Sequence, residues 1–287
     1  MSINPIAGYD ILIWPQYIEE STPGQFPDAG TMNFIAPQAA IEHDADLNHL
    51  LIPGLGSRDV RDILRSLEGY GFTLRFYPIN IDFLNYAVDL TLQKTKTLSL
   101  AAKVEMEDGT KYWKVSWAKP DSLMLTWAVG APVTAEMYFL CRKPVYGDSV
   151  GPTLASDPGT EPLQWYSGGD NPFSIGATTA KIQSFMVRID NNLRAIYAGG
   201  SKEFIALKPG ERRITGRLTV LWRKTEEWDL LTGDQYFDIT WTLDSGVGKQ
   251  MMISDAKLTR IRRFRWEPTG DAITEIYDFF AKSAALT

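Results

Sequence analysis

Gly71-Phe72-Thr73-Leu74-Arg75-Phe76 is matched later in the chain by Gly216-Arg217-Leu218-Thr219-Val220-Leu221, at an offset of 145 residues. The first stretch mixes aromatic, branched and polar residues and the second mixes branched and polar ones, and both have the short alternation typical of a strand with one buried face. Three further matches keep the same order: Gly56-Ser57 with Gly200-Ser201, Val115-Ser116-Trp117-Ala118-Lys119 with Ile253-Ser254-Asp255-Ala256-Lys257, and Ala135-Glu136-Met137-Tyr138 with Thr274-Glu275-Ile276-Tyr277. The preserved order predicts that one supersecondary unit is present twice.

Period-two alternation continues through most of the chain and predicts antiparallel sheets. Residues 98–106 alternate before Asp108-Gly109, a dipeptide that tolerates the positive φ angles of a tight hairpin, and residues 112–117 return. The second half has the same arrangement in residues 236–243 and 250–254. The predicted fold class is therefore mainly β.

A short helix is expected beside the strands of each unit. Residues 225–233 begin with a capping Thr and two Glu and end with Gly, and residues 82–87 occupy the corresponding place in the first half. The copies differ at residues 57–69, where apolar residues follow helical spacing although Pro209-Gly210 would break a helix in the counterpart. We expect either an extra helix or a remodelled loop there.

The composition is that of a folded protein with room for two domains. The 287 residues are 44% hydrophobic and 12% aromatic, which supplies apolar surface for two cores. No apolar run reaches the roughly 18 residues of a membrane span, and the N-terminus does not read as a secretion signal, so we expect a soluble, unsecreted protein. Cys141 is the only cysteine, so no disulfide can form within the chain.

Charge is distributed unevenly along the chain, whose net charge is −6. Residues 1–143 hold 12 Lys and Arg against 17 Asp and Glu, whereas residues 181–287 hold 17 against 14. Opposite signs on two related domains would favour contact between unlike halves of neighbouring chains. Drift of surface charge without selection explains the same numbers equally well.

Four segments are expected along the chain. Residues 1–30, with prolines separated by aromatics, read as an N-terminal arm, and residues 31–143 as a first β domain. Residues 144–180 are rich in Gly and Pro, contain no Lys or Arg and read as a linker, and residues 181–287 form a second β domain. In an assembling protein, an arm and a linker of this kind lie across neighbouring subunits.

No catalytic, cofactor-binding or metal-binding residues are predicted. His43 and His49 lie among three carboxylates, but no further His or Cys ligand is near, so a solvated loop is preferred over a metal site. Gly246-Val247-Gly248-Lys249 lacks the first Gly and the Ser or Thr of a phosphate-binding loop. Because no Ser-His-Asp order or Cys-His pair is present either, we expect a protein that is not an enzyme.

Residues 260–266 form the one basic run that is interleaved with aromatics. Four arginines alternate there with apolar residues, which is one signature of nucleic-acid binding. An ion-pairing interface or a solvated strand face is preferred, because the chain as a whole is acidic and tight phosphate binding needs a basic surface.

Two stretches of the second half carry a family resemblance: Lys181-Ile182-Gln183-Ser184-Phe185-Met186-Val187-Arg188-Ile189-Asp190-Asn191-Asn192-Leu193 and Leu207-Lys208-Pro209-Gly210-Glu211-Arg212-Arg213-Ile214-Thr215-Gly216-Arg217-Leu218-Thr219-Val220, followed by a short helix. This pattern resembles the tail tube proteins of tailed phages and archaeal tailed viruses, of the long-chain, internally duplicated kind. The resemblance is clearest over residues 173–287, and the internal repeat extends it to about residues 30–143.

The resemblance implies two tandem β-sandwich or half-barrel units, each with a short flanking α-helix, whose sheets join across subunits into a closed β-barrel ring. It implies a structural virion protein that is assembled in the host cytoplasm and polymerises into stacked rings, the tail conduit for DNA ejection. Duplication makes each ring a trimer of six pseudo-equivalent domains, with a hexamer of whole chains as the alternative.

The implied partners are other copies of the chain and the tape measure, tail tip and terminator proteins. Viral DNA is expected to pass through the lumen without specific binding, and neither a cofactor nor a membrane is implied. An acidic chain suits a lumen through which DNA has to slide, because phosphate contacts would hold the DNA.

Two alternatives stay open at this point. One is another tail or capsid component, such as a tube terminator or a decoration protein. The other is a carbohydrate-binding β-sandwich, in which Trp113, Trp117 or Trp165-Tyr166 would stack on sugars, although core packing explains most of the 9 Trp residues.

Overall fold

The computed structural model is mainly β, and its strand pairs are antiparallel, which confirms the fold class expected from the alternation. It describes residues 15–37, 39–46, 49–53, 60–65, 67–106, 109–160, 163, 173–176, 181–221, 235–244, 248–264 and 274–287. Within them, the first half contains β1 (Gln16–Glu19), β2 (Asn33–Phe34), β3 (Ala39–Asp46), β4 (His49–Pro53), β5 (Val60–Arg65), β6 (Gly69–Phe76), α1 (Asp82–Val88), α2 (Leu90–Thr95), β7 (Leu98–Met106), β8 (Gly109–Ala128), β9 (Thr134–Cys141) and β10 (Val145–Gly147).

The second half is described over strands alone. They are β11 (Phe173–Ile175), β12 (Ile182–Asp190), β13 (Arg194–Ile196), β14 (Ala206–Lys208), β15 (Arg213–Leu221), β16 (Phe237–Asp244), β17 (Lys249–Phe264), β18 (Thr274–Ala281) and β19 (Ser283–Leu286). The helix predicted at residues 225–233 lies outside the described residues.

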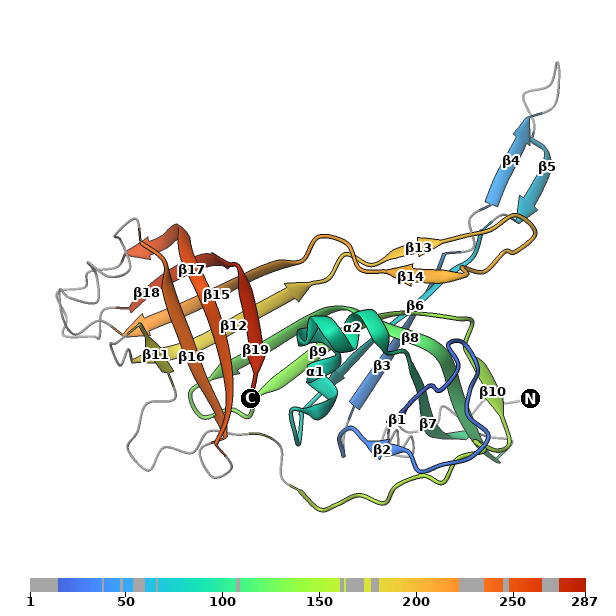
Figure 1. Ribbon diagram of the computed structural model, residues 1–287, viewed down its shortest axis with the longest axis horizontal. Helices are drawn as coiled ribbons and strands as arrows, with labels where there is room; N and C mark the ends of the chain where they lie inside the picture. Colours follow the sequence, from blue (N-terminus) through green and yellow to red (C-terminus); the bar gives the residue numbers. More distant parts are fainter. Residues whose placement is uncertain are drawn as a thin grey trace, which may run out of the picture.

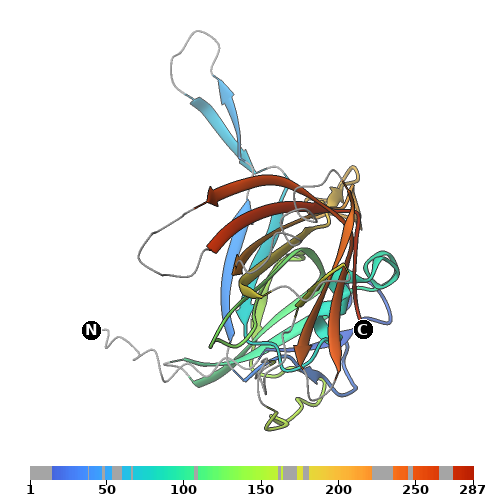
Figure 2. The ribbon, with the colours of Figure 1, turned by 90° about the vertical axis from the view of Figure 1, so that its left-hand side faces the viewer.

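The two halves share one strand order. Across the sheet, the order is β3-β6-β9-β8-β7 in the first half and β12-β15-β18-β17-β16 in the second. Each half also has a projecting hairpin between the first two strands of this order (Figure 1): β4–β5 lies between β3 and β6, and β13–β14 lies between β12 and β15. β12 pairs with the second part of β8, so the two half-sheets are one continuous sheet. This sheet is curved (Figure 2), and its described strands do not close into a barrel within one chain.

Cross-strand pairing defines the correspondence between the halves. β3 pairs with β6 through Glu42 and Thr73, and β12 pairs with β15 through Met186 and Arg217. Counterparts are therefore 144 residues apart on these strands, one fewer than the offset that aligned Gly71 with Gly216.

The counterpart of Gly216 is Phe72, so the predicted alignment of the two glycines was wrong by one residue. Gly216 pairs with Phe279 as Phe72 pairs with Phe139. For the same reason the match of residues 135–138 with 274–277 is shifted by one. A one-residue slip turns every side chain of a strand to the other face, and aligning identical glycines ignored which face is buried.

Both halves carry the same β-bulge on their longest strand. Trp117 on β8 and Asp255 on β17 each have a φ of 53°, and the pairing with the preceding strand slips at both places. An extra bulged residue bends a strand and increases its twist, so each long strand can pair with one neighbour before the bulge and another after it. The offset of 138 predicted for this segment agrees with the observed pairing.

An aromatic core fills each half beneath the sheet. In the first half the rings of Phe72 and Phe139 stack at 4.8 Å, with Phe83 of α1 at 5.9 Å from Phe139. In the second half Phe173 and Trp241 stack at 5.6 Å. α1 confirms the helix expected at residues 82–87, and it lies against β8.

Side chains of the second half hold the end of this helix. Asn191 Nδ2 donates to the carbonyl of Ala87 at 3.1 Å, and Arg212 Nη2 donates to the carbonyl of Val88 at 2.6 Å. Burial lowers the pKa of Arg212. These contacts satisfy carbonyl groups that the helix itself leaves unpaired, and they tie the halves together.

Two local expectations are corrected. Residues 60–65 form β5, paired with β4, so the stretch expected as an extra helix or a loop contains a strand instead. Residues 42–46 and 49 belong to β3 and β4, not to a solvated loop. In both places backbone pairing with a neighbouring strand, which local spacing does not record, decides the structure.

The proposed segment boundaries stay a prediction. Strand β1 lies in the stretch assigned to the arm and pairs with β7, and β10 and β11 lie in the stretch assigned to the linker.

Cys141 is fully buried on β9, and burial raises its pKa far above the usual range of a thiol. Because only the thiolate is reactive, native protein is expected to resist alkylation by iodoacetamide at pH 8, whereas protein in guanidinium chloride is expected to react completely. Mass spectrometry measures both. Rapid labelling of the native protein would contradict the buried position.

Candidate assembly edges

One joint between the halves is built inside the chain. Ser184–Asp190 of β12 pairs antiparallel with Ser122–Ala128 of β8, in a register that includes Asp190 opposite Ser122 and Arg188 opposite Met124. On its other side this part of β8 pairs with β9. The joint therefore adds β12 of the second half to β8, the long strand of the first half.

Two strand edges are the counterparts of this joint. β3 corresponds to β12, and among the described residues it pairs with β6 alone. β17 corresponds to β8, and beyond its bulge its described neighbour is β18. An edge strand leaves a row of backbone donors and acceptors ready to pair with another chain. Among the described residues, β3 and the second part of β17 are thus the two counterparts of the joint whose edges have no strand partner.

The two open edges differ in charge. β3 contains three acidic residues, Glu42, Asp44 and Asp46, and no Lys or Arg. β17 contains Arg260, Arg262 and Arg263 beyond its bulge. On β3 the side chains of Glu42 and Asp44 are exposed. β3 is thus an acidic edge, and the part of β17 beyond its bulge is a basic edge.

The sheet face opposite the core carries arginines that are paired with carboxylates. Arg75 forms ion pairs with Glu42 at 2.6 Å and with Glu136 at 2.7 Å. The hydrogen bond that Arg75 donates to Glu136, together with the negative charge of that carboxylate, raises the pKa of Arg75. Two further pairs on this face are Arg188 with Asp190 at 2.8 Å and Arg217 with Asp278 at 2.9 Å. These pairs leave little net positive charge beside the joint.

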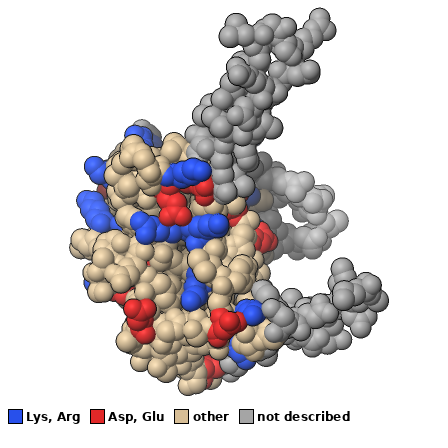
Figure 3. Space-filling view, turned by 90° about the vertical axis from the view of Figure 1, so that its right-hand side faces the viewer, with Lys and Arg blue, Asp and Glu red and all other residues tan. Residues whose placement is uncertain are grey.

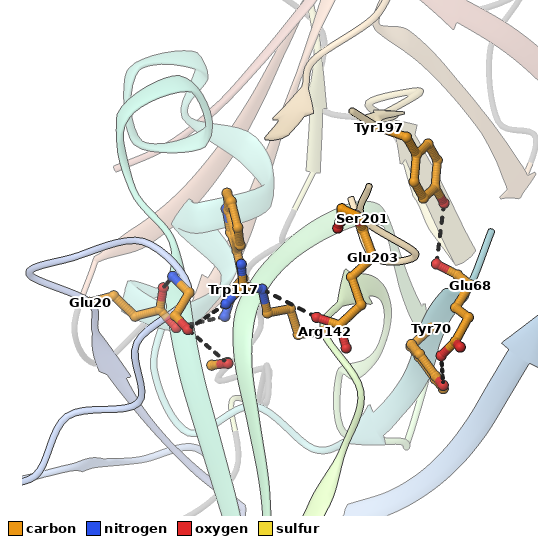
Figure 4. A network of polar contacts seen from close by, with 10 residues as sticks. Glu20, Glu68, Tyr70, Trp117, Arg142, Tyr197, Ser201 and Glu203 are labelled. Carbon is orange, nitrogen blue, oxygen red and sulfur yellow. Dashed lines mark hydrogen bonds and ion pairs between the residues drawn. The ribbon is translucent and has the colours of Figure 1, made fainter. Parts of the chain in front are cut away.

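The β13–β14 hairpin of the second half docks on the first half near the bulge. Figure 4 shows Arg142 and Glu203, 3.7 Å apart, together with Tyr197, whose hydroxyl donates to the carbonyl of Glu68 at 3.3 Å. The N–H of Glu68 donates to the carbonyl of Lys202 at 2.9 Å.

An aromatic residue completes this docking. Phe204 is 3% exposed, and its ring lies 5.3 Å from that of Trp117 in an edge-to-face arrangement. The guanidinium of Arg142 lies over the ring of Trp117, 4.4 Å from the centre of that ring. The hairpin therefore buries one anchor and forms one ion pair on the neighbouring half.

Glu20 organises the bulge from beneath. Its carboxylate is buried and accepts hydrogen bonds from the N–H of Gly24 at 2.7 Å and of Trp117 at 2.6 Å. It also accepts from the hydroxyls of Thr97 at 2.8 Å and Ser99 at 2.7 Å. Four donors converging on one carboxylate hold the left-handed backbone of Trp117 in place.

The structure describes some of the residues that were weighed as sites from the sequence. Among the described residues there is no group of His, Cys, Asp and Glu that could hold a metal ion. The ring of His43 lies 5.2 Å from that of Trp113, and burial lowers its pKa. Trp113 is 1% exposed and so cannot stack on a sugar, and Trp165-Tyr166 lies outside the described residues.

Figure 3 shows basic side chains beside acidic ones in the middle of one face of the molecule, and further basic side chains along the left edge of this view. Sequence reasoning missed Glu20 and the pairing of Arg142 with Glu203, because their partners are distant along the chain. The repeated Gly-Ser of the two hairpins was the one local signal that pointed to these arms.

Comparison with known proteins agrees with this architecture. Within the described residues, no helix has the length and apolar character needed to cross a membrane. No curated protein matches the sequence significantly. A family model described as phage tail tube protein matches residues 16–275, which is most of the chain. The chain therefore belongs to the phage tail tube protein family.

Proposed function

We propose that this protein is a virion tail tube subunit that polymerises into stacked rings, forms the conduit for DNA ejection and carries out no chemistry. Membership of the tail tube family supports the tail assignment. The observation that carries the proposal is the joint between β8 and β12, because its counterparts β17 and β3 have open edges in the same chain.

The two halves are, in this proposal, copies of one unit. The shared strand order, the shared bulge and the constant offset of 144 from β3 to β6 support a duplication. β3 of one chain would then pair with β17 of the next chain as β12 pairs with β8. Three chains would close a ring of six joints, three within chains and three between chains.

The register of the internal joint can be transferred to the proposed joint between chains. Asp190 opposite Ser122 becomes Asp46 opposite Arg260. Arg188 opposite Met124 becomes Asp44 opposite Arg262 or Arg263, because β17 has one extra residue at that point of its pairing with β18. Opposite charges directly across strands stabilise a sheet by about 0.2–1 kcal/mol per pair, and like charges destabilise it.

The paired arginines suit a lumen. If the joined sheets form the barrel, the face opposite each core lines the channel, and Arg75, Arg188 and Arg217 already have carboxylate partners there. Free arginines would bind phosphate and hold the DNA. DNA would pass without specific binding, and the tape measure, tail tip and terminator proteins would be the remaining partners.

Electron microscopy of concentrated protein tests the function. Hollow tubes with threefold symmetry and six similar domains per ring are expected. Sixfold symmetry of whole chains would keep the function and remove the duplicated ring. Short rings that never lengthen would point to a tube terminator, and monomers at every concentration, with the tail initiator proteins present, would contradict polymerisation.

Charge reversal tests the joint. The double variant Arg260→Glu and Arg262→Glu is expected to raise the concentration needed for ring formation by about tenfold or more, since two attractive pairs become repulsive. Adding Asp44→Arg and Asp46→Arg is expected to restore assembly, as measured by sedimentation velocity. The control is Lys94→Glu with Lys143→Glu, exposed residues away from both edges. Equal loss in control and variant, or no restoration, would contradict the proposed register.

A further inference from the structure

A depression beside the second bulge has no occupant in the described chain. It has a volume of about 430 Å³ and is lined by residues that include Tyr236, Asp255, Leu258 and Lys282. Tyr236 is 56% exposed, and the ammonium of Lys282 lies 4.0 Å from the centre of its ring. An exposed aromatic beside a cation is the kind of surface that a protein partner covers.

The same place in the first half is occupied. The N–H of Arg142 donates to the carbonyl of Ser116, and the N–H of Lys282 donates to the carbonyl of Ser254, which makes Arg142 the counterpart of Lys282. Arg142 pairs with Glu203 of the docked β13–β14 hairpin. The first bulge is therefore covered by an arm from the other half, while no described segment covers the second.

The β4–β5 hairpin is the counterpart of that arm. Ile52 pairs with Asp62 as Ile196 pairs with Ala206, so the two hairpins have the same register at the offset of 144. Figure 1 shows β4–β5 projecting away from the body of the chain, at the opposite end from β17 and β18. The β4–β5 hairpin thus points away from its own depression.

The hairpin tips are also alike in sequence. Gly200-Ser201-Lys202-Glu203-Phe204 corresponds to Gly56-Ser57-Arg58-Asp59-Val60. Each tip has a basic, an acidic and an apolar residue in the same order. Glu203 and Phe204 are the residues that make the ion pair and the buried anchor in the first half.

We propose that the depression lined by Tyr236, Asp255 and Lys282 receives the β4–β5 hairpin tip of a second copy of this chain. Asp59 takes the place of Glu203 and meets Lys282, and Val60 takes the place of Phe204 as the apolar anchor. The docking rests on the proposed function, since the hairpin reaches the neighbour to which β3 pairs. Every unit of the ring would then carry an arm on its bulge.

Val60 is smaller than Phe204, so the arm between chains buries less apolar surface than the arm within the chain. The contact between chains is therefore the weaker of the two, as suits a subunit that stays dispersed until assembly begins.

Cross-linking tests this contact. Full-length Asp59→Cys protein is mixed with full-length Lys282→Cys protein and treated with a short bismaleimide, and Cys141 does not compete because it is buried. A covalent dimer containing one chain of each variant is expected, at least about tenfold more abundant than when Asp157→Cys replaces Asp59→Cys. Asp157 is exposed and lies outside both hairpins. The internal counterpart, Arg142→Cys with Glu203→Cys, is expected to react within one chain.

Electron microscopy of the same mixture separates the two proposals. Rings without the cross-linked dimer would overturn the docking and leave the tube function standing. A dimer without rings would support the docking and contradict the ring. An equal dimer yield with Asp157→Cys, or neither dimer nor rings, would also overturn the docking.

Discussion

Replacing Glu20 by Ala is expected to lower the free energy of unfolding by about 3 kcal/mol or more, the largest effect of any single substitution proposed here. The carboxylate is buried, and the variant leaves the N–H groups of Gly24 and Trp117 and two hydroxyls without their acceptor. A hydrogen bond to a charged group contributes about 1.5–3 kcal/mol, and a buried donor left unpaired costs about 1–3 kcal/mol. Equilibrium denaturation in urea measures the change.

Two variants frame this result. Glu20→Gln retains the size of the side chain and one acceptor oxygen, so an intermediate loss is expected. Glu211→Ala removes an exposed carboxylate and is expected to change stability by no more than about 0.5 kcal/mol. If Glu20→Ala were as stable as Glu211→Ala, the four hydrogen bonds would not stabilise the bulge.

Because Glu20 lies within residues 1–30, a deletion that tests the predicted N-terminal arm has to leave this residue in place. Removing residues 1–30 would delete Glu20 and strand β1, which pairs with β7. Any loss of tube formation would then reflect an unstable first half. Removing residues 1–14 keeps both, so it separates a role in assembly from a role in folding.

Gly216→Ala is expected to lower the free energy of unfolding by about 1–3 kcal/mol, the usual range for overpacking a filled core. A Cβ at this position would lie 2.7 Å from the backbone oxygen of Met186 and 2.5 Å from Cε1 of Phe279. The backbone oxygen belongs to the paired strand β12 and cannot move without disturbing the sheet. The loss of stability is measured by thermal or urea denaturation.

Gly199→Ala is the matched control. Apart from its two neighbours along the chain, no heavy atom of the described residues lies within 4 Å of the place where its Cβ would be, and its φ is not in the left-handed region. Its stability is expected to stay within about 0.5 kcal/mol of the parent protein. A Gly216→Ala protein as stable as this control would mean that the ring of Phe279 and the adjacent strand yield without cost.

Gly216 also shows why sequence alignment by identity failed by one residue. In the first half, Phe72 fills the core against Phe139; in the second, the ring of Phe279 lies over Gly216. A large residue and a glycine occupy equivalent places because the volume is supplied by different strands. Packing of this kind conserves total volume rather than residue type, so sequence similarity cannot reveal it.

The sequence by itself determined the mainly β fold, the first helix, the repeated order of segments and the resemblance to tail tube proteins. These features follow from local alternation, from capping residues and from the order of motifs, all of which are recorded in neighbouring residues. The segment with the β-bulge also aligned in the register of the observed pairing, because a serine, an alanine and a lysine match there at one offset.

Only the tertiary structure decided which edges are open. β3 is an edge because, among the described strands, it pairs with β6 alone. The first bulge is covered because the β13–β14 hairpin folds back onto it, and no described hairpin does the same at the second bulge. The carboxylate of Glu20 likewise meets Trp117, 97 residues further along the chain. Pairing between distant strands depends on burial and geometry rather than on local propensity, so these contacts are settled when the sheet forms.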